Sequence, residues 1–281
     1  MKTIIARFIG MYLNVLSVFA PRLAGRQGFY LFCTPRSAPM KNHQNKFLDT
    51  AERSRFWHDG AWVQTYRWGN GPQKILLLHG WQSHTYRWRN YIESISQADF
   101  TIYALDAPAH GRSGGKYLSL PKYSDVIEAF LYSIEPVHTI VSHSMGSFAA
   151  LYTLFRVPQL NIQQLIIMGS PGEAEDFTSF FRSVLALSDR TMKAVYDAFE
   201  RIVQHPPSYY SSVRFASAIK IPMLIIHDEH DDEAPYRHAL KVHEVAPASE
   251  LITTTGLGHN LRSAKVVDHV VDFTARQQQF A

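Results

Sequence analysis

Short apolar runs alternate with helix-like segments along most of the chain. The runs lie at 74–78, 100–105, 139–141, 165–168, 223–227 and 250–254. Most are continuous, as expected of strands that are covered on both faces. Helical spacing separates most of them, at 86–96, 123–133, 145–155, 236–245 and 264–275. Ahead of them, Asp59-Gly60 between strand-like stretches at 54–58 and 61–68 predicts a hairpin. This order predicts an α/β fold, with one mostly parallel sheet of about eight strands and helices on both faces.

The alternation of strand and helix patterns stops between Met168 and Met223, where more than fifty residues contain no strand pattern. Two helix-like stretches, 173–187 and 190–204, occupy this gap. Helical insertions at the C-terminal edge of a parallel sheet lie over the ligand crevice. We therefore expect a helical cap at 171–219, inserted into an α/β core made of 47–170 and 220–281.

Residues 1–46 precede this core and divide into two parts. Met1 to Ala20 is apolar, but Thr3, Arg7, Gly10, Asn14 and Ser17 recur at helical spacing and form one narrow stripe. The stripe favours an amphipathic helix that is retained and either packs on the body or lies on a membrane surface. A signal peptide over residues 1–20, which would imply export, and a membrane anchor are the alternatives. Residues 21–46 are predicted to be an irregular connector, because prolines and glycines punctuate them.

Composition narrows the class of protein. Hydrophobic residues make up 46% of the 281-residue chain and charged residues 19%, which is typical of a globular core. The net charge of +4 comes from scattered lysines and arginines, so we expect no nucleic-acid partner. The single cysteine, Cys33, excludes an intramolecular disulfide and is compatible with the cytoplasm. Composition leaves the oligomeric state open.

The candidate chemistry begins at Ser144, in the pentapeptide Ser142-His143-Ser144-Met145-Gly146. A buried strand pattern leads into this serine and a small-residue helix pattern leads out. A serine hydroxyl is a weak nucleophile until a base takes its proton and donors hold the oxyanion. A tight strand-to-helix turn exposes the hydroxyl and directs the helix N-terminus toward the developing charge.

Two further segments supply the remaining parts of such a site. His79-Gly80-Trp81 follows the run at 74–78, and the glycine permits a tight turn there. The backbone N–H groups of Trp81 and Met145 are therefore the expected oxyanion donors. Thr255 to His259 contains two glycines in a loop that delivers His259 to the same edge of the sheet.

A cluster of acids follows the apolar run at 223–227. Asp231 is the expected partner of the histidine, with Asp232 and Asp228 as alternatives. A metal site is a further alternative that we do not favour, because the candidate ligands match no known spacing. Those candidate ligands are His227, Asp228, His230, Asp231 and Asp232.

With Ser144, Asp231 and His259 in that order, the chain resembles the α/β-hydrolase fold serine hydrolases over about residues 54 to 275. The loop Leu105 to Ser113 is similar to the Asp-x-x-Gly-x-Gly-x-Ser loop of that superfamily, with Ala109 where glycine is usual. We expect this loop to shape the floor of the pocket. Ser142 and Ser147 stand where glycines are common. A serine nucleophile argues against the epoxide-hydrolase and haloalkane-dehalogenase branches, which attack through a carboxylate.

The resemblance implies an acyl-enzyme mechanism in which Ser144 attacks, His259 moves the proton and Asp231 orients the histidine. Apolar and aromatic residues of the expected cap predict a pocket for an uncharged or hydrophobic carboxylic ester of modest size. The candidate substrate contacts are His143, Trp81, Phe177 and Phe181. We expect no cofactor and no metal. A thioesterase, a lipid esterase, a C–C bond hydrolase, a perhydrolase and a non-catalytic ligand-binding member are the alternatives.

Overall fold

The structure is a computed structural model that describes residues 2–36 and 39–276. The chain forms two compact units. The sheet unit contains Pro35–Gly172 and Ser212–Ala281, and the helical unit contains Met1–Thr34 and Glu173–Ser211.

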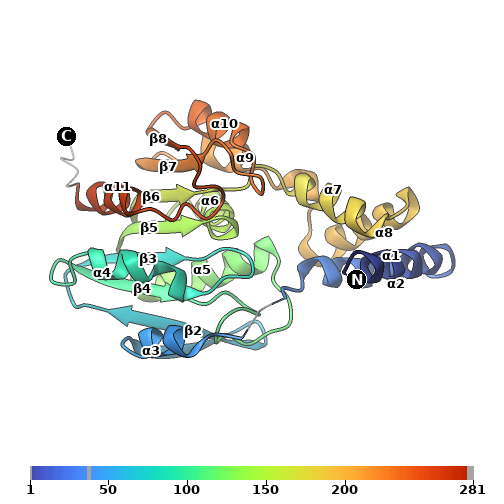
Figure 1. Ribbon diagram of the computed structural model, residues 1–281, viewed down its shortest axis with the longest axis horizontal. Coiled ribbons are helices and arrows are strands. Elements are labelled where there is room, and N and C mark those ends of the chain that lie inside the picture. Colours follow the sequence, from blue (N-terminus) through green and yellow to red (C-terminus); the bar gives the residue numbers. More distant parts are fainter. Residues whose placement is uncertain (1, 37–38, 277–281) are drawn as a thin grey trace. The chain divides into compact units, whose positions relative to one another are not determined.

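The sheet unit is built on one eight-stranded sheet with the order β1-β2-β4-β3-β5-β6-β7-β8 (Figure 1). Its strands are β1 (Glu52–His58), β2 (Ala61–Trp68), β3 (Gln73–Leu78), β4 (Phe100–Leu105), β5 (Val137–His143), β6 (Ile162–Met168), β7 (Met223–Asp228) and β8 (Ser249–Thr254). β2 pairs antiparallel with both β1 and β4, and all other pairs are parallel. The predicted mixed sheet and its starting hairpin are confirmed.

Helices cover both faces of this sheet. Alternate strand residues such as Ile75, Leu77 and Ile102 join one core cluster, which α4 and α11 complete. On the opposite face α6 contacts the central strands, with α5 and α9 beside it. The helical elements of this unit are α3 (Asn42–Leu48), η1 (Thr85–Trp88), α4 (Arg89–Ser94), α5 (Leu120–Ile134), α6 (Met145–Arg156), α9 (Ser212–Ser217), α10 (Arg237–Val245) and α11 (Ala264–Ala275).

The helical unit joins the N-terminal segment to the expected cap. Its elements are α1 (Lys2–Phe19), α2 (Pro21–Cys33), α7 (Ala174–Leu185), α8 (Asp189–Val203) and the short η2 (Pro207–Tyr209). The sequence boundaries treated 1–46 and 171–219 as separate parts, but residues of both pack in this unit. Among the described helices, none is long and apolar enough to cross a membrane.

The irregular connector predicted at 21–46 is wrong, because α2 and α3 occupy most of it. Pro21 takes the first helical position of α2, where a missing N–H costs nothing. Gly25 and Gly28 do not break the helix but let α8 approach it closely. A Cβ at Gly25 would lie 2.0 Å from the Ala194 carbonyl oxygen, and one at Gly28 would lie 2.6 Å from Val195 Cγ2. The same glycines that resemble helix breakers in the sequence are therefore packing residues.

Candidate active site

Ser144 lies at a sharp turn between β5 and α6. Its backbone adopts φ 54° and ψ −126°, a left-handed conformation that is uncommon for a residue with a side chain. The Ser144 N–H donates to the Met168 carbonyl at 2.9 Å, which ties the turn to the end of β6. The turn therefore holds a strained serine in one orientation at the C-terminal edge of the sheet.

The two serines that replace the usual glycines of this turn have bonded hydroxyls. Ser142 Oγ donates to the Ile166 carbonyl at 2.8 Å, and Ser147 Oγ accepts from the Met168 N–H at 3.2 Å. Both bonds reach the neighbouring strand β6. The departures from the superfamily pattern thus add links between the turn and the sheet.

Two glycines bring the turn after β3 against Ser144. A Cβ at Gly80 would lie 2.7 Å from Ser144 Cβ and 3.2 Å from its Oγ. A Cβ at Gly146 would lie 2.5 Å from the Leu78 carbonyl oxygen. Any side chain at either position would push the two turns apart. The backbone that follows Gly80, where Trp81 begins, is consequently held next to the serine.

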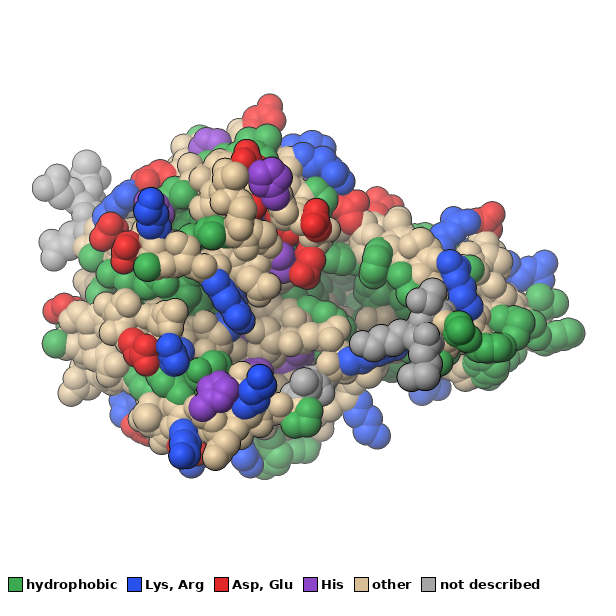
Figure 2. All heavy atoms as spheres, viewed as in Figure 1, with side chains coloured by type: hydrophobic (Ala, Val, Ile, Leu, Met, Phe, Trp, Pro, Cys, Tyr) green, Lys and Arg blue, Asp and Glu red, His purple; other side chains and the backbone are tan. Residues whose placement is uncertain are grey.

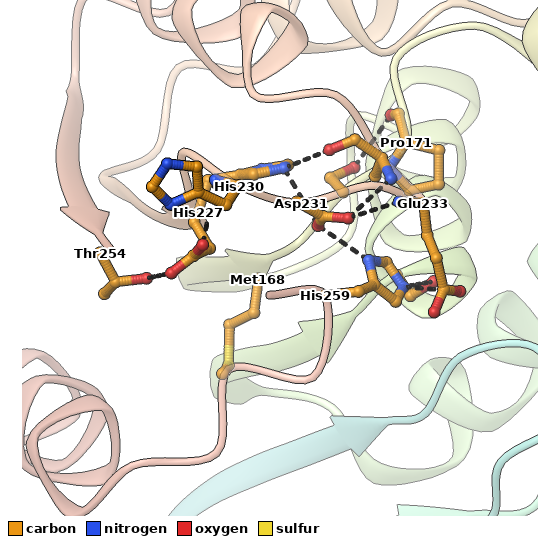
Figure 3. A network of polar contacts seen from close by, with 12 residues as sticks. Met168, Pro171, His227, His230, Asp231, Glu233, Thr254 and His259 are labelled. Carbon is orange, nitrogen blue, oxygen red and sulfur yellow. Dashed lines mark hydrogen bonds and ion pairs between the residues drawn. The ribbon is translucent and has the colours of Figure 1, made fainter. Parts of the chain in front are cut away.

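His259 connects Ser144 to Asp231 through a chain of hydrogen bonds. His259 Nε2 lies 2.9 Å from Ser144 Oγ. His259 Nδ1 lies 2.8 Å from Asp231 Oδ2 (Figure 3). The Asp231 carboxylate accepts from Nδ1–H, which leaves Nε2 as the acceptor for the serine hydroxyl. The structure thus brings together three residues from the ends of β5, β7 and β8.

Several donors surround the Asp231 carboxylate. Burial alone would raise its pKa, but hydrogen bonds from His227, His259 and the Ala234 N–H outweigh burial and hold the pKa well below its usual range. Its Oδ1 accepts from the N–H groups of Glu233 and Ala234 at 2.9 and 2.8 Å. Asp231 is therefore an anion in a fixed orientation.

Asp228, one of the two alternative acids, has a different role in the structure. Its Oδ2 accepts from Thr254 Oγ1 and the Leu257 N–H, both at 2.8 Å, and its Oδ1 accepts from the His230 N–H. Burial opposes ionisation, yet these bonds keep the pKa of Asp228 below its usual value. The carboxylate organises the loop that delivers His259 rather than contacting the histidine ring.

His227 lies on the far side of Asp231 from His259 (Figure 3). Its Nε2 donates to the Ala234 carbonyl at 2.7 Å and lies 3.3 Å from Asp231 Oδ2. The ring is fully buried and helps to orient the acid. Within the described ranges, no group of three or more His, Cys, Asp or Glu side chains is arranged to hold a metal ion.

Two buried histidines order the loop that carries Trp81. His79 Nε2 accepts from the Ala107 N–H at 2.9 Å, and His110 Nε2 accepts from the Gln82 N–H at 3.0 Å. Burial lowers the pKa of both rings, that of His79 to about 3, so both are neutral acceptors. His110 is a residue that sequence reasoning missed, because nothing in the 105–113 loop motif marks it as a partner of residue 82.

Asp106 fixes the 105–113 loop itself. Its carboxylate accepts from Tyr66 Oη, the Thr85 N–H and hydroxyl, and the Arg112 N–H, each at 2.8 Å. Gly111 passes so close that a Cβ there would lie 2.2 Å from Asp106 Oδ2. Ala109, where the superfamily has glycine, adopts φ 63°. Through the bonds of Ala107 to His79 and of His110 to Gln82, this loop holds the turn beside Ser144 in place.

The expected substrate contacts are spread over both units. His143 is buried, and its Nε2 donates to the His259 carbonyl at 2.8 Å, so it braces the histidine loop. Burial, with Arg87 and His259 nearby, holds the pKa of His143 well below its usual value. Trp81 packs its ring against His110. Phe177 and Phe181 lie on α7 in the helical unit, where the Phe181 ring contacts Phe32.

Glu233 is a further neighbour of the site that sequence reasoning did not single out. Its Oε2 lies 3.8 Å from His259 Nε2, and its side chain is 71% exposed. It follows Asp231 by two residues, inside the acidic cluster, but only the loop conformation turns it toward the histidine. The Glu233 carboxyl group therefore lies beside the His259 ring and is largely exposed to solvent.

Comparison with known proteins agrees with this architecture. The family described as serine aminopeptidase, S33, matches residues 70–206. A pimeloyl-[acyl-carrier protein] methyl ester esterase of Nitrosomonas europaea is 29% identical over 102 residues. That match covers 36% of this chain and 38% of the relative. A monoacylglycerol lipase of Mycolicibacterium smegmatis is 38% identical over 80 residues, 26% of this chain and 29% of the relative.

The chain thus aligns with well under half the length of these two enzymes. Among solved structures, an esterase from Exiguobacterium antarcticum superposes with a TM-score of 0.60 at 15% identity, covering 78% of this chain and 97% of the esterase. At that identity the likeness shows the fold. Together with the sheet order, it shows that this chain has the α/β-hydrolase fold.

Proposed function

We propose that this protein is a serine hydrolase that cleaves carboxylic esters of modest size, uncharged or hydrophobic, through an acyl-enzyme. One observation carries the proposal: the unbroken chain from Ser144 Oγ through the His259 ring to Asp231, with steps of 2.9 and 2.8 Å. A strained serine next to an oriented imidazole is the arrangement that activates a hydroxyl.

In the first step Ser144 Oγ attacks the ester carbonyl carbon while His259 Nε2 takes the hydroxyl proton. The buried Asp231 carboxylate stabilises the imidazolium that results. The N–H groups of Trp81 and Met145 are the proposed donors to the oxyanion, since Gly80 and Gly146 bring both turns against the serine. His259 then gives its proton to the leaving alcohol, and a water molecule, activated by the same imidazole, releases the acid.

The preference for uncharged esters rests on the charge near the serine. Glu233 Oε2 lies 3.8 Å from His259 Nε2 and would repel an anionic acyl or leaving group. The buried rings of His79, His110 and His143 have lowered pKa values and add no positive charge. Arg87, near His143, is a cation that acts against this repulsion. The names of two relatives, a pimeloyl-[acyl-carrier protein] methyl ester esterase and a monoacylglycerol lipase, support an ester as the substrate.

A serine-reactive fluorophosphonate probe tests the nucleophile. We expect the wild-type protein to be labelled and Ser144→Ala to lose labelling and p-nitrophenyl ester hydrolysis together. Ser142→Ala is the matched control, because its hydroxyl donates to the Ile166 carbonyl and should be dispensable for labelling. Labelling that persists in Ser144→Ala, or its absence in the wild type, would overturn the assignment. A panel of thioester, β-diketone and peroxide substrates then separates the ester reaction from related chemistry.

A further inference from the structure

Helix α1 buries a narrow side made of small and polar residues together with Leu13, and it leaves a broad apolar side exposed, unlike most helices in water-soluble proteins. Gly10 and Ser17 are buried and Asn14 is half-buried, whereas eight large apolar or aromatic side chains of the same helix are exposed. These eight are Ile4, Ile5, Phe8, Met11, Tyr12, Val15, Val18 and Phe19. Amphipathic helices normally bury their apolar stripe against the core.

Polar contacts fix α1 in this orientation. The Asn14 side chain donates to the Ala186 carbonyl at 3.0 Å and accepts from the Ser188 N–H at 2.9 Å, which caps the turn between α7 and α8. Thr191 Oγ1 lies 2.8 Å from Asn14 Oδ1 and 3.0 Å from Ser17 Oγ. Rotating the helix to bury its apolar side would leave these groups without partners.

Backbone packing also determines which side of α1 faces α7. Gly10 fits so tightly against α7 that a Cβ there would lie 1.7 Å from the Leu185 carbonyl oxygen. Only the side of α1 that carries Gly10 can approach α7 this closely. The inward side is therefore specified, and the packing of the helical unit leaves the other side of α1 exposed.

The outward side is continuous. Ile4, Phe8, Met11 and Val15 follow one another at helical spacing, with Phe19 at 83% exposure closing the line. Ile4, Arg7, Phe8 and Met11 line a shallow apolar hollow. Figure 2 shows hydrophobic side chains gathered at the right of the view, over α1. Exposed apolar patches of this kind mark surfaces that meet a membrane or another protein.

The charged residues of α1 and α2 favour one kind of partner for the apolar face. Arg7 lies on α1, Arg22 and Arg26 lie on α2, and the sequence has no acidic residue before Asp49. We infer that the apolar face of α1 docks on the surface of a bilayer that contains anionic lipid, with these basic residues facing the headgroups. A second copy of the chain is disfavoured, because face-to-face pairing would bring the same cations together.

Vesicle flotation of the full-length protein tests this inference. The vesicles are phosphatidylcholine alone and phosphatidylcholine mixed with phosphatidylglycerol, each at low and high salt. We expect binding to the mixed vesicles that weakens at high salt. Phe8→Glu/Val15→Glu, which places acids on two side chains that are 61% and 56% exposed, should reduce binding by at least about tenfold. Leu240→Glu, on an exposed position of α10, is the matched control and should bind as the wild type does.

A second variant keeps the apolar face intact. Arg22→Gln/Arg26→Gln should weaken binding to the anionic vesicles by about fivefold for each charge removed, and should leave binding to neutral vesicles unchanged. Thermal unfolding followed by circular dichroism establishes that each variant is folded.

Any of three results would overturn the inference. The first is that the wild type fails to bind anionic vesicles, and the second is that both double variants bind them as the wild type does. The third is sedimentation of a lipid-free dimer that Phe8→Glu/Val15→Glu dissociates, because a second copy would then cover the face.

Discussion

His79 offers a quantitative test of how the sheet unit orders the loop beside Ser144. The ring is fully buried at the end of β3. Its Nδ1–H donates to the Gly80 carbonyl at 2.8 Å, and its Nε2 accepts from the Ala107 N–H at 2.9 Å. Protonation would turn that acceptor into a donor facing another donor. Burial and the nearby His110 lower the pKa of His79 to about 3, against an opposing effect of Asp106.

The sign and size of the pH effect follow from linkage. In the unfolded chain a histidine takes up its proton near pH 6.5, whereas the folded ring stays neutral to about pH 3. The stabilisation is therefore fully present above pH 6.5 and is lost as the pH falls from there toward 3. Lowering the pH from about 7.5 to about 5.5 should cost about 1.4 kcal/mol of unfolding free energy through this one residue. Glutamine at position 79 cannot titrate and should remove that part of the pH dependence.

Urea unfolding at the two pH values measures the effect. Tryptophan fluorescence is a suitable signal, because all five tryptophans lie between residues 57 and 88 in the sheet unit. Between the two pH values the free energy of unfolding falls in both proteins. The fall should be about 1.4 kcal/mol smaller in His79→Gln than in the wild type. His110 and His143, whose pKa values are also lowered, are common to both proteins. His269→Gln, at an exposed position of α11, controls for the loss of a histidine as such. Equal pH dependence in the wild type and His79→Gln would refute the reasoning.

Three further changes test separate features. Gly25→Val should destabilise the helical unit by about 1–3 kcal/mol in thermal unfolding, because the Cβ of the valine would meet the Ala194 carbonyl. A stability equal to that of the wild type would mean that α2 and α8 can separate freely. Ala109→Gly should raise the free energy of unfolding in urea by up to about 1 kcal/mol, since glycine adopts φ 63° without strain, and a loss of stability would contradict this. Glu233→Gln should raise kcat/KM for an anionic ester over a neutral one by up to about fivefold at low salt, and an unchanged ratio would remove Glu233 from the account of substrate charge.

The sheet was the most predictable part of the molecule. β4 and α11 begin and end at the residues that hydrophobic spacing indicates, because a strand covered on both faces must be apolar throughout. Helix α2 was missed because Gly25 and Gly28 have the same local signature whether they break a helix or admit a neighbour. Only the position of α8 distinguishes these roles, and local sequence does not contain that position.

In the candidate site, too, some residues could be predicted from local sequence and others could not. Ser144, His259 and Asp231 were predicted from the motifs at three strand ends, since the carboxyl ends of parallel strands meet at one edge. Backbone N–H groups in loops make the contacts of three other residues, His110, Glu233 and Asp228. Their contacts depend on how residues 82, 233 and 257 are turned, and no spacing rule describes those turns.

Helix α1 shows what periodicity alone leaves undetermined. The spacing of Gly10, Asn14 and Ser17 correctly indicates that one side of the helix differs from the other. It does not say which side meets the protein, because that depends on the surface opposite. Here the surface offers the carbonyl of Ala186, the N–H of Ser188 and the backbone of α7 at close range, so the small and polar side is the one that fits. Polar groups with good partners, together with the buried Leu13, decide the orientation of this helix, and the larger apolar area on its other side stays exposed.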